Sequence, residues 1–328
     1  MLILSQREVE ELLDPDALVD ALAAAMVDLS AGRASAPNRV AALVQQREGL
    51  LAAMPGYAPS AAVLASKLVT LFPRNAGTEL PTHQAVIAVF DPRTGRPLAL
   101  LDGNAITAAR TAAGSALATR LLAAQDAPTI AILGTGVQAR AHARAVTRVR
   151  RFSELRIAGR DPVKARELAA ELRGELDLRI TAASSFAQAC AGASVICATT
   201  HALEPIVRRQ WLAPGVHVNS VGYNPQGREV DDLTVSEALV VVESRAAALA
   251  PPPAGANDLL QPIERGLIDA DHIHAELGEL VDGTRPGRSS AEQITLYKSV
   301  GVAVQDVAAA AVVLRGTRER GVGQEVEL

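Results

Sequence analysis

The residues best suited to chemistry begin with a glycine-rich run. Gly134-Thr-Gly136-Val-Gln-Ala139 follows the apolar segment 129–133 and opens a helical pattern over 137–149. Between a strand and a helix, this G-x-G-x-x-A spacing is typical of dinucleotide binding. Gly134 permits a tight turn, Gly136 lets the backbone approach a pyrophosphate, and the small Ala139 lets helix and strand pack closely. The free N–H groups of the helix would then bind the anion. The alternative is a tight structural turn without a ligand.

The end of the next expected strand, 154–158, bears on which dinucleotide binds. NAD sites usually carry an acidic residue here that binds the ribose 2′-hydroxyl, and Asp161 could serve. However, Asp161 directly precedes Pro162, and an aspartate before a first-turn proline is typical of a helix N-cap. Arg160 is the better-placed cation for a 2′-phosphate. The sequence therefore favours NADP, with NAD as the alternative.

Two basic side chains stand in segments that are otherwise apolar or small. Lys67 lies in 65–72 and Arg110 in 105–124. A buried cation is unfavourable unless it has an anionic partner. Two interpretations follow: an internal salt bridge, or a clamp on a substrate carboxylate or cofactor phosphate, which an arginine can bind bidentately.

The elements that must position these residues form two patterns. From 128 onward strands alternate with helices, which predicts a parallel sheet with crossover helices. The strands expected there are 129–133, 154–158, 194–198, 216–221 and 238–242, and the helices are 137–149 and 162–172. Before 128, a helix capped by Ser5 and Glu8 precedes strands expected at 39–44, 50–54, 65–72, 85–90 and 97–101. Segment 294–314 is expected to be one long helix that returns to the first domain.

Composition excludes several function classes. A chain of 328 residues favours two domains. The net charge of −4 and the 2% aromatic content argue against nucleic acid and an anionic membrane as partners. No uncharged apolar run reaches about 18 residues and the N-terminus lacks a signal pattern, so we expect a cytoplasmic protein. Cys190 and Cys197 are expected to be free core thiols. His272 and His274 have no third histidine or cysteine nearby, so no metal site is expected.

Motifs along nearly the whole chain resemble one known family in the same order. They are Phe72-Pro-Arg-Asn75, Leu80-Pro-Thr-His-Gln84, Leu101-Asp-Gly103, Ala109-Arg-Thr-Ala112, Gly134-Thr-Gly-Val-Gln138, Glu276-Leu-Gly278, Pro286-Gly-Arg288 and Thr295-Leu-Tyr-Lys-Ser-Val-Gly301. The chain is similar in these motifs to the ornithine cyclodeaminase/mu-crystallin family.

This resemblance implies an α/β fold and a homodimer. A Rossmann domain would span 121–299, and both chain ends, 1–120 and 300–328, would form an α+β substrate-binding and dimerisation domain. Arg39 and Lys67 would contact the substrate carboxylate, with Val300 near the substrate. Besides Gly134, Gly136 and Arg160, the residues implied at the cofactor are Thr82, Arg110, Val137, Gln138, Thr200, Asn219, Ser220, Val221, Arg228 and Ser299.

Two departures from the cyclodeaminases bear on the reaction. By the family resemblance, Asn224 occupies the loop position at which the cyclodeaminases carry an aspartate. An amide cannot act as a general base at neutral pH. Ala52 stands two residues before Met54, where the ornithine enzymes carry an acidic residue for the distal ammonium. The mu-crystallin branch also lacks the loop aspartate and resembles an NADPH-dependent ketimine reductase.

The sequence therefore favours NAD(P)H-dependent reduction of a cyclic imino acid. Δ1-Pyrroline-2-carboxylate or Δ1-piperideine-2-carboxylate would give proline or pipecolate. Lys67 and Asn224 are the expected catalytic residues: Lys67 or a water donates the proton, and Asn224 is a hydrogen-bonding group near the ring. An ornithine cyclodeaminase, an amino-acid dehydrogenase and a non-catalytic binding protein are the alternatives.

Overall fold

The chain folds into two units in a computed structural model that describes residues 1–252 and 254–327. Unit 1 comprises Met1–Arg110 and Gly301–Leu328, and unit 2 comprises Thr111–Val300. The sequence-based domains were divided at 120/121 and 299/300, and the last residue of the predicted first domain, Leu328, lies outside the described residues. Helix α3 (Gly103–Leu122) carries the chain from unit 1 into unit 2.

Unit 1 is built on a seven-stranded sheet in the order β15-β1-β6-β5-β4-β3-β2. The strands are β1 (Leu2–Leu4), β2 (Val40–Val44), β3 (Gly49–Ala58), β4 (Val63–Leu71), β5 (His83–Phe90), β6 (Pro97–Asp102) and β15 (Gln324–Glu325). The helices of this unit, apart from the start of α3, are α1 (Gln6–Leu12), α2 (Pro15–Ser30), η1 (Gln45–Arg47), η2 (Pro73–Asn75) and α11 (Ala303–Arg320). The capping box expected at Ser5 and Glu8 is confirmed at the start of α1.

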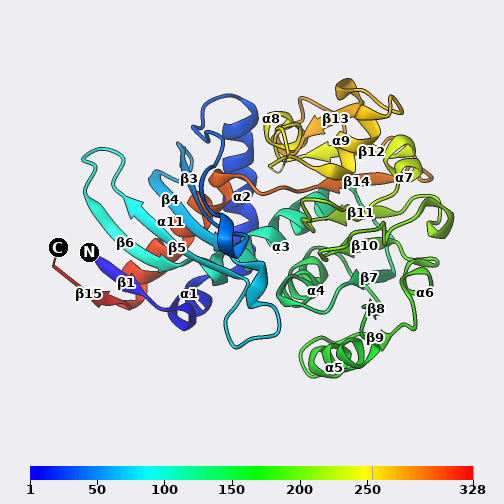
Figure 1. Cartoon of the computed structure of the whole chain (residues 1–328), viewed down its shortest axis with the longest axis horizontal. Helices are drawn as coiled ribbons and strands as arrows, with labels where there is room; N and C mark the ends of the chain where they lie inside the picture. Colours follow the sequence, from blue (N-terminus) through cyan, green and yellow to red (C-terminus); the bar gives the residue numbers. More distant parts are fainter. Residues whose placement is uncertain (253, 328) are drawn as a thin grey trace. The chain divides into compact units, whose positions relative to one another are not determined.

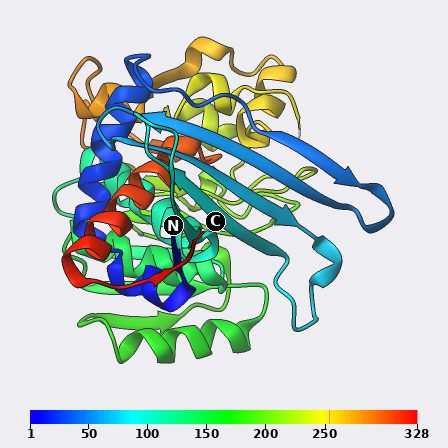
Figure 2. The same ribbon diagram turned by 90° about the vertical axis from the view of Figure 1, so that its left-hand side faces the viewer.

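One face of this sheet is covered by helix α11. This helix contacts β3, β4 and β5 and packs against α2, and Figure 2 shows the red α11 beside the blue α2. Because side chains alternate along a strand, Ala65, Lys67 and Val69 share the buried face of β4, whereas Leu64 and Leu68 point to the exposed face. Lys67 is thus the one charged side chain that β4 directs toward α11.

Unit 2 is a parallel eight-stranded sheet in the order β13-β12-β14-β11-β10-β7-β8-β9. The strands are β7 (Thr129–Leu133), β8 (Glu154–Ala158), β9 (Arg179–Ala182), β10 (Val195–Ala198), β11 (His217–Ser220), β12 (Leu239–Val242), β13 (Ile273–Glu276) and β14 (Thr295–Lys298). The helices are α4 (Val137–Val149), α5 (Pro162–Arg173), α6 (Phe186–Cys190), η3 (Arg209–Trp211), α7 (Asp232–Glu237), α8 (Arg245–Ala248), α9 (Asn257–Glu264), η4 (Ala270–His272) and α10 (Leu277–Val281). Figure 1 shows α4 and α6 on opposite sides of the strands. The predicted α/β fold with a Rossmann-type domain is confirmed.

The prediction of one helix over 294–314 was wrong. Thr295–Lys298 is strand β14, which lies between β12 and β11, and α11 begins only at Ala303. All four residues of β14 are buried, so the segment shows no alternation and continues the apolar pattern of the helix that follows. The short strands β9 and β13 were not expected from the sequence either.

The cysteines and histidines singled out in the sequence have ordinary structural surroundings. Cys190 and Cys197 are buried free thiols, and burial raises the pKa of each to about 12. His272 Nε2 and His274 Nε2 each lie 2.8 Å from a backbone carbonyl oxygen. Within 1–252 and 254–327, no group of three or more His, Cys, Asp or Glu side chains could hold a metal ion. No helix of those residues is both long and apolar enough to cross a membrane.

Candidate functional site

The glycine-rich run forms the turn between β7 and α4. Gly134 has a φ of +129°, and a Cβ built there would lie 2.5 Å from Thr199 Oγ1, so the turn requires glycine. Gly136 is the N-cap of the 13-residue helix α4 and provides no side-chain cap, and a Cβ on it would meet no atom within 4 Å. Helix α4 therefore begins without a side-chain cap and with room beside Gly136, which fits a bound pyrophosphate.

The next residues of α4 support the same assignment. Val137 is 67% exposed, whereas the side-chain oxygen of Gln138 is buried and has no hydrogen-bond partner among the described residues. Ala139 is fully buried, as close packing of helix and strand requires. A buried amide oxygen without a donor is unfavourable unless a ligand or water supplies one. The residues present thus fit a dinucleotide.

The end of β8 separates the two candidates for ribose recognition. Asp161 caps α5, because its Oδ1 accepts hydrogen bonds from Val163 N at 2.8 Å and Lys164 N at 3.4 Å. The N-cap interpretation of Asp161 is therefore confirmed. Arg160 is exposed beside it. A cation, and not a free carboxylate, is the group that this edge offers to a ribose substituent.

Most of the other side chains predicted at the cofactor make hydrogen bonds within unit 2. Thr200 donates to Glu229 through N (2.6 Å) and Oγ1 (2.9 Å), and Ser220 Oγ donates to the same carboxylate at 2.9 Å. The remaining partners are Thr119 for Asn219, Glu243 for Ser299 and Asp232 for Arg228. Because β7, β10, β11 and β14 are parallel, Thr200, Val221 and Ser299 follow their strands at the edge that carries the glycine-rich turn. This is the edge at which doubly wound sheets bind ligands.

In unit 1, Lys67 and Arg110 converge on a residue that the sequence analysis missed. Lys67 is 2% exposed, and its Nζ lies 2.9 Å and 3.1 Å from the two carboxylate oxygens of Asp306. Arg110 Nε donates to Asp306 Oδ1 at 3.2 Å, and its Nη1 donates to Gln305 Oε1 at 2.8 Å. The salt bridge considered for these two cations is thus present, with one carboxylate shared between them.

A third cation adds to the positive potential around Lys67. Arg39 lies in the same unit, where its Nη2 donates to Gly301 O at 3.0 Å, and it adds to the positive potential at Lys67. Lys67 therefore has one paired carboxylate and two neighbouring cations that add to the positive potential around it. Burial lowers the pKa of Lys67 to about 8, opposed by the attraction of Asp306 and reinforced by Arg110 and Arg39. The positive potential at Lys67 suits a further anion, and the pKa of about 8 means that this lysine loses its proton slightly above neutral pH.

His83 borders the same cluster from β5. Its Nδ1 lies 3.3 Å from Asn104 Oδ1, and burial together with the charge of Lys67 lowers its pKa. The imidazole is therefore neutral at neutral pH and adds no further positive charge. Thr82, which precedes it, is exposed, and its carbonyl accepts a hydrogen bond from Phe72 N at 2.9 Å.

Small apolar side chains line the sheet around Lys67. In the pairing of β3 with β4, Met54 lies opposite Lys67 and Ala52 lies opposite Val69. These side chains share a buried cluster, whose members are Ala52, Met54, Val69, Ala85 and Ala303. Apolar side chains therefore flank Lys67 on the buried face of the sheet.

Asn224 lies in the loop after β11, and both ends of its side chain bind the protein. Oδ1 accepts a hydrogen bond from Gln226 N at 2.9 Å, and Nδ2 donates to His201 O at 3.0 Å. The amide thus shapes its own loop. Val300, at the end of unit 2, has its N–H bound to Glu243 Oε2 at 2.9 Å.

Comparisons with known proteins agree with this arrangement. The model of the ornithine cyclodeaminase/mu-crystallin family matches residues 1–321. Mus musculus ketimine reductase mu-crystallin is 39% identical over 315 residues, covering 94% of this chain and 95% of the relative. A Bacillus cereus Δ1-pyrroline-2-carboxylate reductase is 35% identical over 329 residues, covering 100% of both chains. The solved structure of Thermococcus litoralis Δ1-pyrroline-2-carboxylate reductase with NADH and L-proline has a TM-score of 0.95 and 37% identity, covering 99% of this chain and 100% of that one.

Proposed function

The chain belongs to the ornithine cyclodeaminase/mu-crystallin family, and we propose that it reduces a cyclic imino acid with a nicotinamide cofactor. It is an oxidoreductase, as are the named relatives. Δ1-Pyrroline-2-carboxylate and Δ1-piperideine-2-carboxylate are the proposed substrates, and proline and pipecolate the products. The names of the Bacillus and Thermococcus relatives favour the five-membered ring.

The observation that carries this proposal is the buried cation cluster at Lys67, where Arg110 shares the carboxylate of Asp306 and Arg39 adds to the positive potential. A 2-imino acid brings a carboxylate, which would lower the electrostatic free energy of Lys67 and Arg110, which share Asp306, and of Arg39 in the same unit. Arg39 and Lys67 are the proposed carboxylate ligands. The small apolar side chains beside Lys67 suit a hydrocarbon ring.

Lys67 is also the proposed proton donor. Its Nζ donates a hydrogen bond to Asp306 Oδ1 and lies 2.9 Å from Oδ2. Because an ammonium has three N–H bonds, this carboxylate leaves at least one for an imine nitrogen or a substrate carboxylate. A pKa of about 8 leaves the ammonium mostly protonated at neutral pH and makes it a stronger acid than an exposed lysine. Protonation of the imine nitrogen by Lys67 makes the neighbouring carbon more electrophilic.

The cofactor supplies the hydride, and its binding is assigned to unit 2. The uncapped α4 N-terminus and Gln138 support pyrophosphate binding. Arg160 supports a preference for NADPH over NADH, because Asp161 caps helix α5 and Arg160 is the remaining charged group at the end of β8. The other side chains proposed around the dinucleotide remain those assigned by the family resemblance. Asn224 is proposed as a neighbour of the ring.

Ornithine cyclodeamination fits this chain less well. That reaction needs a base for the substrate amine, and the Asn224 amide accepts no proton at neutral pH. Ala52 offers no charge to a distal ammonium and lies in an apolar cluster. An amino-acid dehydrogenase remains the second candidate, since the same cations would bind any 2-imino or 2-keto acid.

A second copy of the chain is the proposed partner. The sheet face of unit 1 that lies opposite Lys67 exposes Leu51, Leu64, Leu68 and Val86, each at 38–43%. An apolar sheet face of this kind is typical of an interface. Light scattering should give twice the chain mass, and the double substitution Leu64→Glu and Leu68→Glu should give a monomer. A monomeric parent protein would rule the interface out.

The two free thiols favour a reducing compartment such as the cytoplasm.

The proposed reaction is tested by NADPH consumption with each cyclic imine, beside ammonia release from ornithine with NAD⁺. NADPH consumption with an imine and no ammonia from ornithine is the expected result. Ammonia and proline from ornithine would identify a cyclodeaminase instead. Activity only with open-chain keto acids and ammonia would favour the dehydrogenase.

A further inference from the structure

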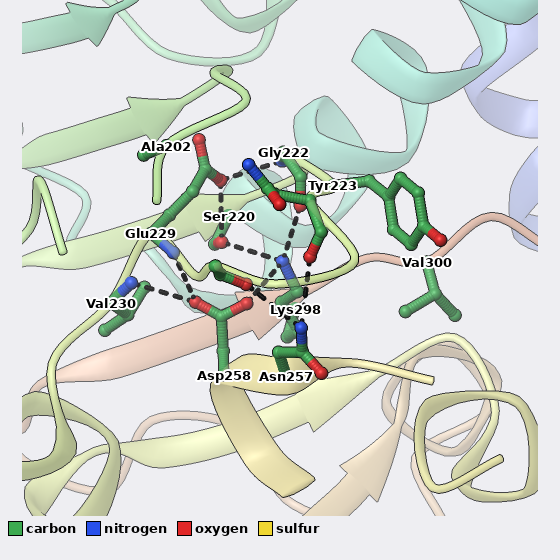
Figure 3. Close-up of polar contacts among 12 residues, drawn as sticks. Ala202, Ser220, Gly222, Tyr223, Glu229, Val230, Asn257, Asp258, Lys298 and Val300 are labelled. Atoms are coloured by element: carbon green, nitrogen blue, oxygen red, sulfur yellow. Dashed lines mark hydrogen bonds and ion pairs between the residues drawn. The ribbon is translucent and has the colours of Figure 1, made fainter. Parts of the chain in front are cut away.

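Lys298, at the end of β14, has its ammonium group surrounded by acceptors of unit 2. The side chain is 2% exposed, and its Nζ lies 2.9 Å from Asp258 Oδ2, 3.1 Å from Ser220 Oγ and 3.0 Å from Gly222 O. Figure 3 shows the ammonium in the centre of these acceptors. An ammonium has three N–H bonds, and each has an acceptor here. Lys298 belongs to the Thr295–Gly301 motif, but neither the proposed catalytic step nor the proposed ligands use it.

A buried carboxylate holds the same turn from its other side. Glu229 is 1% exposed and accepts four hydrogen bonds, from Thr200 N and Oγ1, Ser220 Oγ and Gly222 N, at 2.6–2.9 Å. Burial raises the pKa of Glu229, and the charge of Lys298 opposes that shift. Gly222 thus has its N–H bound to Glu229 and its carbonyl bound to Lys298. A Cβ on Gly222 would lie 2.1 Å from Thr200 O, so the chain passes here without room for a side chain.

The start of helix α9 fixes the rest of the loop. Asp258 Oδ1 accepts from Glu229 N at 2.9 Å and Val230 N at 2.8 Å. Asn257 Nδ2 lies 3.0–3.1 Å from three loop carbonyls, which belong to Asn224, Pro225 and Gly227. Figure 3 shows Asn257 and Asp258 below the loop and Lys298 between them and Ser220. Segment 221–230 has almost no regular secondary structure. Side chains from α9 and β14 nevertheless bind its main chain along its length.

In the proposed cofactor assignment, this segment lies beside one half of the dinucleotide. The chain reverses its strand order between β7 and β10, and a dinucleotide lies across the carboxyl edge of the sheet at that point. The pyrophosphate belongs at the N-terminus of α4 and the adenosine ribose at the end of β8. The nicotinamide half therefore extends toward β10 and β11, and segment 221–230 follows β11 directly.

We propose that Lys298 is a positioning residue for the nicotinamide half of the cofactor. Together with Asp258 and Glu229, it fixes the main chain of segment 221–230 in one conformation before the cofactor binds. This inference rests on the cofactor assignment of the proposed function and is independent of the identity of the imine. Preorganised main-chain groups bind the nicotinamide ring without the entropic cost of ordering a loop.

The test compares two ligands that share the adenosine end. Lys298→Met is titrated with NADPH and with 2′-phospho-ADP-ribose, which lacks the nicotinamide ring, and thermal unfolding is recorded beside both. The expected result is about tenfold or more weaker NADPH binding, with unchanged affinity for 2′-phospho-ADP-ribose. Thr295→Val, at the opposite end of β14, is the matched control for loss of a buried polar contact and should leave both affinities unchanged.

A double variant separates positioning from stability. Lys298→Met leaves Asp258 as a buried carboxylate without its cation, which destabilises the fold. Lys298→Met with Asp258→Asn removes that charge and keeps Oδ1 as acceptor for Glu229 N and Val230 N, so the melting temperature should recover while NADPH affinity stays low. Recovery of both, or a parallel loss of both ligands in Lys298→Met, would overturn the proposal. Failure of the parent protein to bind NADPH, NADH and 2′-phospho-ADP-ribose alike would refute the cofactor assignment itself.

Discussion

The substitution Asp306→Asn tests the link between the buried charges of unit 1 and the proton that the reaction needs. The amide keeps the size of the carboxylate and one oxygen acceptor, but removes the negative charge that Lys67 and Arg110 share. Asp306 raises the pKa of Lys67 against the effects of burial, Arg110 and Arg39. Its neutralisation must therefore move that pKa further below about 8.

The size of the shift follows from the geometry. Two unit charges 2.9 Å apart interact by about 6 kcal/mol at an effective dielectric constant of roughly 20, which corresponds to roughly 4 pKa units. Neighbouring opposite charges in proteins shift a pKa by about 1–3 units, because solvent and side chains rearrange. We therefore expect the Lys67 pKa to fall by at least about 1 unit.

The assay is the pH dependence of kcat/KM for Δ1-pyrroline-2-carboxylate. A lysine donor is protonated below its pKa, so activity of the parent protein should be lost as the pH rises through about 8. In Asp306→Asn the same loss should occur at least about 1 unit lower. Protonation of the substrate itself is common to both proteins and cancels in the comparison. An unchanged alkaline limb in a folded variant, shown by a cooperative thermal unfolding transition, would refute Lys67 as the donor coupled to Asp306.

Three further substitutions probe separate parts of the account. Lys67→Met should lower kcat/KM by about a hundredfold or more while NADPH affinity is retained, and near-normal activity would exclude Lys67 as acid and carboxylate ligand. Arg160→Gln should weaken NADPH binding about tenfold and leave NADH binding unchanged, as measured by paired fluorescence titrations. Tighter binding of NADH than of NADPH by the parent protein would contradict the proposed preference. Asn224→Asp should give ammonia release from ornithine that increases with pH, because the new carboxylate must ionise beside His201 O. No ammonia at any pH would show that a loop carboxylate alone does not restore cyclodeamination.

Local patterns predicted much of the fold because they act over short distances. Asp161 before Pro162 indicated the cap of α5, and the spacing of Gly134 and Gly136 indicated a turn between β7 and α4. The same reasoning failed at Thr295–Lys298, where a strand buried on both faces shows no period of two. An apolar run followed by an Ala/Val helix is then read as one helix.

The candidate site could be predicted only in part, for a different reason. Lys67 and Arg110 were conspicuous as cations in apolar segments, but their partner Asp306 lies 239 residues from Lys67 in the sequence. A single aspartate near the start of an apolar helix is not distinguishable from a first-turn acidic residue. The network of Lys298, Glu229 and Asp258 was missed likewise, because its members come from β14, the loop after β11 and α9.

The central claim, that this chain transfers hydride to the carbon of a cyclic imine, is tested most directly by following the hydrogen itself. Δ1-Pyrroline-2-carboxylate would be incubated with NADPH that carries deuterium at the transferred position, and the product analysed by mass spectrometry and NMR. The account predicts proline with a single deuterium on the carbon that bears the carboxylate. Unchanged imine, or proline without deuterium at that carbon, would contradict it.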